Sequence, residues 1–527
     1  MVLLALLALP PCAVSASHQD VRAHGARGDG SAKDTAAVQR AIDACAAAGG
    51  GTVLFSTGTY LCGSIHLRSN VTLRLEAGAT IKGSRDLADY DAPEKLGFPN
   101  AADSETALFR RALIGGEDVE GIAIVGEGTI DSNFSRRGGP KPIALKRCRR
   151  VRIEGVRILH APNYAISMLG TDFVDIDGVT IQDSFSDGID PDSCRNVRIA
   201  NCHIETPDDS IVLKTSFSLG EHRPCDNVTV TNCFLASARH CFKIGTETGS
   251  DFRRIAVSNC VMQSLPGRGP AAAAVALLTV DGANVEGVTV SNLTIAGVRA
   301  PIFLRLGNRG RDMTTPAPGS LRNVSIANVV AVGATLACGI AGLPGSPVED
   351  VTLSNIRVTY TGSGPMRTAS EAILEQVAAY PDSTMFGALP AYGLWCRHVT
   401  GLTLSNVQLV AQPGFWRFST QEGRSVRWDT DPPTPSQPAA PGPAVVCDDV
   451  SRLRVDGLEA SASNDGSPVV QLVDVRDALI RGSVAPDGVR TFIDIRGPRS
   501  SSVTLLGNAL RAAKVAATRA AGAPKRR

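Results

Sequence analysis

From residue 151 onward, apolar and polar residues alternate in a short phrase that returns many times along the chain. Copies span Val151–Gly155, Val174–Gly178, Val197–Asn201, Val228–Asn232, Ile255–Asn259 and Val288–Asn292, and three later copies end at Asn328, Asn355 and Asn406. The first three copies lie 23 residues apart (151, 174, 197), whereas later spacings are longer and vary. An alternation with period two indicates a short strand that buries one face.

One such strand cannot bury its apolar face alone, but parallel stacking of many strands creates a continuous core. Loops of different lengths then absorb the irregular spacing. A β-propeller fits less well, because its blades need four strands each and a near-constant length. The pattern therefore predicts an all-β fold, a right-handed parallel β-helix, with stacked strands from about residue 52 to residue 410.

The recurring asparagines are typical of tight bends, where a left-handed backbone is tolerated and a side-chain amide can bond to the next turn of the solenoid. We expect Asn201, Asn232, Asn259 and Asn292 at equivalent bends. Cysteines directly follow the first three of these, as Cys202, Cys233 and Cys260. Equivalent positions face the same way, so these thiols are expected as a buried, unpaired column of small apolar groups. The pairing of the other cysteines stays open.

The two ends of the solenoid differ from its middle. Asp34 is a candidate cap for a helix whose apolar positions Val38, Ala41, Ile42 and Cys45 share one face, and this helix would cover the open end of the core. The apolar run Val2–Leu9 and the small residues before residue 17 indicate a signal peptide, and hence a secreted or periplasmic protein. We expect a signal peptide at 1–16, one catalytic β-helix domain at 17–505 with a proline-rich loop at about 411–446, and a disordered tail at 506–527.

The charge balance excludes some classes of partner. The chain has 53 basic and 51 acidic residues and a net charge of +2. A protein that binds nucleic acid or a membrane surface in general would carry a more basic balance. Any anionic substrate must therefore be recognised by a few local cations.

Acidic residues gather between successive copies of the phrase. Asp187, Asp190 and Asp192 lie between the second and third copies of the phrase, and Asp208 and Asp209 lie after the third. The offset from Asp187 to Asp208 is close to one repeat, which places these carboxylates on neighbouring turns and the same face. Like charges at that range raise one another's pKa, so a protonated acid and an ionised base can coexist there. Asp190 and Asp192 also fit a role in turns, and a calcium site stays open as well.

One turn further on, His240 and Lys243 are directed towards the same face. At this point the chain resembles glycoside hydrolase family 28, the polygalacturonases and their relatives. The family's Asn-Thr-Asp motif is matched at Asp187, its Gly-Asp-Asp motif at Asp208 and Asp209, and its Gly-His-Gly motif at His240. Its Arg-Ile-Lys motif is absent, and Val-Ala-Leu-Leu stands in that place at 275–278.

Two further stretches carry the resemblance, which covers about residues 19–410. The opening stretch, from 25–30 to 75–81, is similar to the N-terminus of many pectin-active β-helices, and the segment 380–394 is similar to that of bacterial relatives.

The resemblance implies single displacement with inversion. Asp208 would protonate the leaving oxygen, while Asp187 and Asp209 would hold and deprotonate a water, with acid and base roughly 6.5–9.5 Å apart. His240 would tune the acid or bind the sugar. Lys214, Lys243 or Arg305 would replace the missing cations that bind the substrate carboxylate.

The expected partner is an acidic, pectin-like polysaccharide or oligosaccharide. We expect a monomer that needs no cofactor and no resident metal, and that binds neither nucleic acid nor a membrane. Two alternatives remain at this stage: a calcium-dependent polysaccharide lyase on the same fold, and a non-catalytic carbohydrate-binding β-helix.

Overall fold

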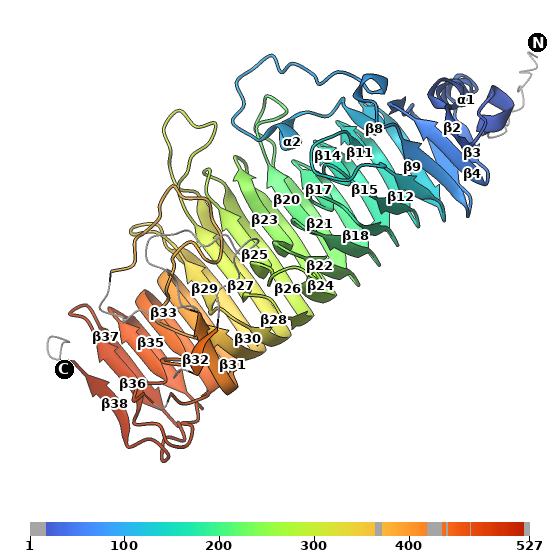
Figure 1. Cartoon of the computed structure of the whole chain (residues 1–527). Coiled ribbons are helices and arrows are strands. Elements are labelled where there is room, and N and C mark those ends of the chain that lie inside the picture. Colours follow the sequence, from blue (N-terminus) through green and yellow to red (C-terminus); the bar gives the residue numbers. More distant parts are fainter. Residues whose placement is uncertain (1–16, 364–371, 419–434, 439–440, 464, 521–527) are drawn as a thin grey trace, which may run out of the picture.

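The chain winds into one long right-handed parallel β-helix, with its N-terminus at one end and its C-terminus at the other (Figure 1). The structure is a computed structural model that describes residues 17–363, 372–418, 435–438, 441–463 and 465–520. The expected signal peptide at 1–16 lies outside the described residues, as does half of the expected proline-rich loop at 411–446 (419–434 and 439–440). Strand pairs in the described ranges are parallel, except that β32 (Pro435–Pro438) runs antiparallel to the end of β31 (Leu394–Phe418).

Each turn of the solenoid, here called a rung, contributes to three parallel sheets. The first sheet contains β5 (Ile65–His66), β8 (Ala112–Glu117), β11 (Lys141–Lys146), β14 (Ile166–Leu169), β17 (Ile189–Asp192), β20 (Ile211–Thr215), β23 (His240–Thr248), β25 (Ala273–Thr279), β27 (Ala300–Leu306), β29 (Cys338–Ala341), the start of β31, β33 (Val445–Ala460), β34 (Val470–Val473), β36 (Thr491–Arg496) and β38 (Val515–Arg519).

The second sheet contains β1 (Ser17–Asp20), β3 (Gly51–Phe55), β6 (Val71–Leu75), β9 (Glu120–Gly126), β12 (Arg149–Glu154), β15 (Asp172–Asp177), β18 (Arg195–Ala200), β21 (Cys225–Thr231), β24 (Phe252–Ser264), β26 (Asn284–Ala296), β28 (Ser320–Ala334), β30 (Val348–Ser363), the middle of β31 and of β33, β35 (Arg476–Arg481) and β37 (Ser501–Leu506). The third contains β2 (Asp29–Lys33), β4 (Gly58–Cys62), β7 (Ala79–Gly83), β10 (Thr129–Asp131), β13 (Arg157–Leu159), β16 (Thr180–Gln182), β19 (His203–Thr206), β22 (Phe234–Ser237) and the later parts of the long strands from β24 onward.

The recurring phrase is the unit that stacks. Its first apolar residue pairs with the first apolar residue of the next copy, from Val151 and Val174 to Val197 and Val228, and on through Ile255. Every one of these side chains is buried in a single apolar core that follows the axis of the solenoid. The predicted parallel stacking is therefore confirmed, and the inward face of each rung supplies the core.

The asparagines form a ladder along one edge of the solenoid. The backbone φ of Asn201, Asn232, Asn259 and Asn292 lies between 55° and 57°, in the left-handed region. The amide of Asn292 donates to the side-chain oxygen of Asn259 at 2.9 Å, and the ladder continues to Asn328, Asn355 and Asn406. The bends were therefore predicted correctly.

The cysteines behave as the stacking argument expects. Cys202, Cys233 and Cys260 are buried and unpaired, and each thiol lies within hydrogen-bond distance of a backbone carbonyl two residues earlier. The twelve cysteines in the described ranges, from Cys45 to Cys447, are all buried and free. They pack as small apolar side chains, so this part of the chain is held by its core rather than by disulfides.

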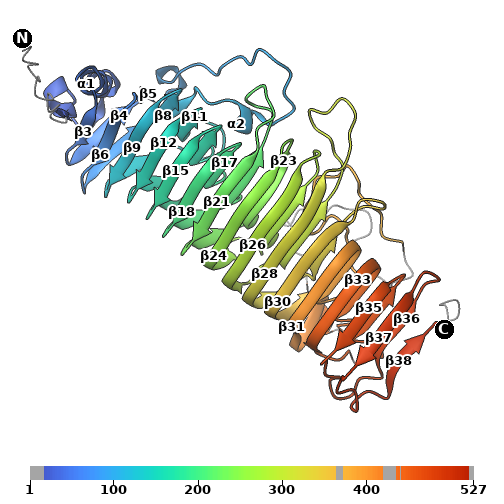
Figure 2. The ribbon, with the colours of Figure 1, turned by 180° about the vertical axis from the view of Figure 1, so that it is seen from behind.

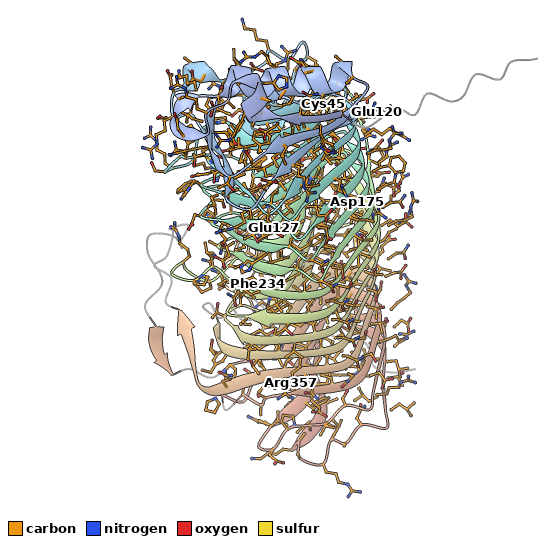
Figure 3. The ribbon with its side chains drawn as sticks, turned by 90° about the vertical axis from the view of Figure 1, so that its right-hand side faces the viewer. Cys45, Glu120, Glu127, Asp175, Phe234 and Arg357 are labelled. Carbon is orange, nitrogen blue, oxygen red and sulfur yellow. The ribbon has the colours of Figure 1, made fainter. Side chains whose placement is uncertain are left out.

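Helix α1 (Thr35–Ala47) covers the N-terminal end of the core, with Val38, Ala41, Ile42 and Cys45 fully buried. The expected cap needs a correction: Asp34 precedes the helix, but its carboxylate accepts hydrogen bonds from the backbone amides of Arg27 and Gly28, not from the helix. Asp34 thus fixes the preceding loop. Figure 3 shows the stack from its side, with Cys45 of α1 at one end and Arg357 of β30 towards the other.

The rungs continue further towards the C-terminus than the sequence pattern indicated. Where a disordered tail was expected from residue 506, β38 pairs in parallel with β36, as Ile493 with Ala517 and Ile495 with Arg519. The alanines of β38 give little apolar contrast, so the alternation is hard to see in the sequence. Residues 521–527 lie outside the described part of the chain.

The longer loops rise from one long edge of the solenoid, as both Figure 1 and Figure 2 show. They include the connection from β7 to β8, which carries the short helices η2 (Leu87–Asp89) and α2 (Ser104–Ala107). Another 3-10 helix, η1 (Val21–His24), precedes α1. None of the helices in the described ranges has the length and apolar run needed to cross a bilayer.

Candidate active site

Four polar residues follow one another on successive rungs of the first sheet. The backbone amide of Ala165, next to Tyr164, donates to the carbonyl of Asp187, and the amides after Asp187 and Asp209 donate to the carbonyls of Asp209 and His240. Tyr164, Asp187, Asp209 and His240 therefore occupy equivalent positions, one per rung. Strand spacing of about 4.8 Å brings their side chains into contact, as the offset between the aspartates predicted.

Asp209 is held between the side chains of His240 and Lys243. Its Oδ1 lies 2.7 Å from Nδ1 of His240, and its Oδ2 accepts from Nζ of Lys243 at 2.8 Å. Burial alone would raise the pKa of Asp209, but the charges of Lys243 and His240 outweigh it and hold this pKa below its usual value. Asp209 is thus an ionised carboxylate fixed in one orientation.

Asp187 has a different environment. Its Oδ1 accepts from the backbone amide of Asp209 at 3.2 Å, and its Oδ2 accepts from Nζ of Lys214 at 3.2 Å. Burial raises its pKa well above the usual value, the charge of Asp208 adds to this, and Lys214 opposes both. A carboxylate with a raised pKa is a stronger base, which suits proton abstraction near neutral pH.

Lys214 pairs with the carboxylates of both Asp187 and Asp190. Its Nζ lies 3.0 Å from Oδ1 of Asp190 and 4.0 Å from the centre of the Tyr164 ring. Burial would lower the pKa of Lys214, but the charges of Asp190 and its neighbours raise it well above its usual value. The charge of Asp190 therefore stabilises the protonated form of Lys214.

Asp208 is the member of the cluster that reaches solvent, with 24% of its side chain exposed against 5% for Asp187 and for Asp209. Its Oδ2 accepts from Nη1 of Arg137 at 2.6 Å, and the same guanidinium pairs with Glu105 of α2 at 2.5 Å. Arg137 lies in the loop between β10 and β11, and no periodicity or motif in the sequence marked it or Glu105.

The three catalytic candidates meet in one cluster. One oxygen from each of Asp187, Asp208 and Asp209 lies within 4.8 Å of the others. The separations of roughly 6.5–9.5 Å for inversion and ~5–5.5 Å for retention refer to whole carboxyl groups, so the approach of single oxygens does not distinguish them. The contacts of each oxygen must therefore decide the stereochemistry. Such a cluster could also hold a cation, but three of the four oxygens of Asp187 and Asp209 already contact His240, Lys243 or Lys214.

Lys141 is a further residue that the sequence did not single out. It lies on the rung before Tyr164, is 1% exposed, and its Nζ lies 3.7 Å from the centre of the Phe109 ring. Within the described residues this Nζ has no hydrogen-bond partner. Burial lowers the pKa of Lys141 to about 7, opposed most by the charge of Asp190. Lys141 adds a titratable cation behind the acidic cluster.

The other expected residues take different places. Arg305 does not join the cluster: its guanidinium donates to the backbone carbonyls of Gly342, Glu375 and Gln376. Asp192 accepts from the backbone amide and the hydroxyl of Ser216, and burial raises its pKa to about 6.

The stretch that stands where the Arg-Ile-Lys motif would fall is buried. Ala276 pairs with Lys243 on one side and with Phe303 on the other, and both Ala276 and Leu278 belong to an apolar cluster with Trp395. This stretch lies between two cations, because Leu278 pairs with Arg305 on the next rung and Ala276 pairs on the rung before with Lys243. The Nζ of Lys243 also donates to the hydroxyl of Tyr380 at 3.2 Å.

Fold and site together define a solenoid with a carboxylate cluster on one outer face, and the comparisons give its class. The family model described as "Glycosyl hydrolases family 28" matches residues 56–378, more than half of the chain. A second, described as "Rhamnogalacturonase A/epimerase, pectate lyase-like", matches residues 19–87. The chain belongs to family 28 of the glycosyl hydrolases.

Two curated relatives have low sequence identity to this chain but align with most of its length. A probable polygalacturonase of Vitis vinifera is 24% identical over 63% of this chain and 72% of its own length. An exo-poly-alpha-D-galacturonosidase of Dickeya chrysanthemi is 23% identical over 79% of this chain and 75% of its own length. Among solved structures, an exopolygalacturonase of Thermotoga maritima superposes with a TM-score of 0.60 and 22% identity, over 75% of this chain and 91% of that one. That similarity shows the parallel β-helix.

Proposed function

We propose that this protein hydrolyses glycosidic bonds in a galacturonate-containing, pectin-like polysaccharide by an inverting acid–base mechanism. The observation that carries the proposal is the different exposure of three clustered carboxylates: Asp208 is partly exposed, whereas Asp187 and Asp209 are buried. The names of the relatives, polygalacturonase and exo-poly-alpha-D-galacturonosidase, support the substrate class.

Asp208 is the general acid, because it is the carboxyl that a bound polysaccharide can reach. It gives its proton to the leaving glycosidic oxygen while a water attacks the anomeric carbon. Asp187 and Asp209 hold that water, and its proton passes to Asp187, whose raised pKa makes it the stronger base. The products are two shorter sugar chains, and the added oxygen comes from water.

A covalent intermediate would need a carboxylate with a free oxygen aimed at the anomeric carbon. Both oxygens of Asp209 are held, by His240 and Lys243, and both oxygens of Asp187 accept from the Asp209 amide and Lys214. These contacts suit two carboxylates that orient a water, which favours inversion. Nε2 of His240 is buried without a partner in the described ranges and is the donor or acceptor for a sugar hydroxyl.

Arg137 is the candidate ligand for the carboxylate of the sugar. Lys214 and Lys243 are buried and ion-paired, whereas the side chain of Arg137 is 47% exposed beside Asp208. A substrate carboxylate can take over the donors that now contact Asp208 and Glu105, which also releases Asp208 for catalysis.

The variant Arg137→Gln tests this assignment. Loss of a hydrogen bond to a charged group costs about 1.5–3 kcal/mol, so KM for polygalacturonate is expected to rise about tenfold to a hundredfold, with a smaller change in kcat. Arg136→Gln is the matched control, since Arg136 is exposed in the same loop. Equal kinetics of the two variants would contradict the assignment.

The proposed setting follows from the substrate. A polymer of this size is met outside the cell, so we propose a secreted or periplasmic monomer that needs no cofactor or resident metal, and activity is expected to survive a chelator.

The direct experiment incubates the protein with polygalacturonate, rhamnogalacturonan and xylogalacturonan and identifies the released sugars. Release of saturated, acidic oligosaccharides supports the proposal. Unsaturated products that vanish with chelator would favour the lyase alternative, and binding without release would favour a carbohydrate-binding β-helix.

A further inference from the structure

On the outer face of the first sheet, the side chains change from polar to apolar directly after His240 and Lys243. On the next rung these residues pair with Ala273 and Ala276, and on the rung after that Ala300 and Phe303 follow. Apolar side chains on the outside of a solenoid are normally exposed to solvent unless another segment covers them. Here Ala273, Ala276, Ala300 and Phe303 are at most 1% exposed.

Residues 372–391, here called the covering segment, lie over this apolar face. Phe386 packs edge-on against Trp395, with ring centres 4.8 Å apart, and Phe386 and Leu389 join the same cluster as Ala276 and Phe303. Burial of these apolar side chains stabilises the covering segment against the sheet. A substrate chain that followed the sheet from Asp209 past His240 would therefore meet packed side chains.

Polar contacts fix the covering segment as well. The hydroxyl of Ser383 donates to the carbonyl of Ala272 at 2.7 Å. Arg305 donates to the carbonyl of Glu375 at 2.6 Å, and Arg397 donates to that of Ile373 at 2.7 Å. These contacts give Arg305 its role: it holds the covering segment in place.

Packed side chains also lie along the sheet in the opposite direction. Phe109 packs with Ala144, Leu169 and the partly buried Leu219 in a separate apolar cluster on the rungs before Asp187. The hydroxyl of Tyr164 lies 3.1 Å from that of Thr106 in α2, and Tyr164 is 5% exposed. Packed side chains thus stand on both sides of the acidic cluster along the axis of the solenoid.

A polysaccharide cleaved in its middle must continue past the catalytic carboxylates in both directions. We propose, on the basis of the function proposed above, that this site is a blind pocket that admits only a chain end, so that the enzyme is exo-acting. Between the rung of Asp208 and the covered face there is one rung, that of His240 and Lys243. At about 4.8 Å per rung, this leaves room for a short released fragment of fixed size.

The test compares product size with bond cleavage on polygalacturonate. At equal release of reducing ends, the wild-type protein is expected to lower viscosity several-fold less than an endo-acting enzyme and to yield one short product from the first time point. A ladder of intermediate lengths with an early loss of viscosity would overturn the proposal. If no reducing ends appear from any pectic polymer, the proposed function itself fails, which is a different result.

A variant of the covering segment sharpens the comparison. Phe386→Ala combined with Leu389→Ala loosens the cover, and longer products with a steeper loss of viscosity are expected. Leu374→Ala is the control, because Leu374 belongs to the same segment but is 70% exposed. If the double variant folds, as judged by melting, and its product remains identical to that of the wild type, the cover does not set the mode of action. If it does not fold, the wild-type product profile decides.

Discussion

At the scale of single residues, the site shows how neighbouring carboxylates acquire different properties. Asp187 and Asp209 are equally buried, but burial dominates at Asp187 and raises its pKa, whereas Lys243 and His240 dominate at Asp209 and lower its pKa. Two carboxylates on adjacent rungs thus differ in basicity because of the cations beside them. Asp208 differs again, by its exposure.

The variant Asp208→Asn tests the acid directly. An amide cannot deliver a proton to the leaving oxygen, so kcat is expected to fall by about 10²–10⁴. Stability is expected to change by only about 0.5 kcal/mol, because Asp208 is partly exposed. Asp183→Asn, an exposed substitution shortly before Asp187, is the control for both readouts. Cleavage at the wild-type rate by a normally folded Asp208→Asn protein would move the acid to another residue.

Asp192 predicts a pH dependence of stability. Burial raises its pKa from 3.8 to about 6, so the folded state prefers the protonated form. The stabilising contribution is fully present below about pH 4 and is lost as the pH rises through 6. This loss amounts to about 2–3 kcal/mol at full burial.

Asp192→Asn removes this ionisation. Between pH 4 and pH 7, its melting temperature is expected to fall less, or rise more, than that of the wild type. Melting curves of wild type, Asp192→Asn and the exposed control Asp183→Asn give the comparison. The same pH response in all three proteins would show that Asp192 does not titrate in this range.

Sequence reasoning found some of these residues and missed others for a physical reason. Asp187, Asp208, Asp209 and His240 lie on strands or tight turns whose repeat fixes their position, so their spacing alone places them together. Arg137 and Glu105 come from long loops without periodicity, and nothing in their sequence states which rung they approach. The acidic cluster was therefore predictable from the sequence, whereas the exposed Arg137 beside it was not.

At the scale of elements, the asparagine ladder shows how one residue type serves both the backbone and its neighbour. Each asparagine has a left-handed φ that an L-residue avoids at a cost of about 1–2 kcal/mol, and asparagine tolerates it because its short side chain bonds locally. The repeat of the bend follows from the sequence. The placement of the covering segment does not, because it depends on apolar packing against distant rungs.

Substitutions at Asn292 separate the two contributions. Asn292→Ala loses the amide contacts to Asn259 and Asn328 and keeps a Cβ in the left-handed region without the local side-chain bond that offsets its cost, for an expected loss of about 1–3 kcal/mol. Asn292→Gly loses the same contacts but relieves the backbone, so it should be more stable than the alanine variant by about 1 kcal/mol. Denaturant midpoints measure both. A glycine variant as unstable as the alanine variant would show that the φ carries no cost here.

At the scale of the whole molecule, the solenoid separates stability from chemistry. One apolar core follows the axis from α1 to the last rungs, while the longer loops gather on one edge (Figure 1, Figure 2). Loops on such a scaffold can change without disturbing the core. This explains why the fold was predictable from the repeat, whereas the closure of the site by loops required the structure.

The central claim is that this scaffold hydrolyses a pectic chain by single displacement at Asp187, Asp208 and Asp209. Proton NMR of polygalacturonate digestion tests it most directly, because the anomeric signals of the new reducing ends appear before they equilibrate. We predict that the first product has the anomeric configuration opposite to that of the cleaved linkage, and that Asp208→Asn gives almost none of it. A first product with the original configuration, or one that is unsaturated, would contradict this account.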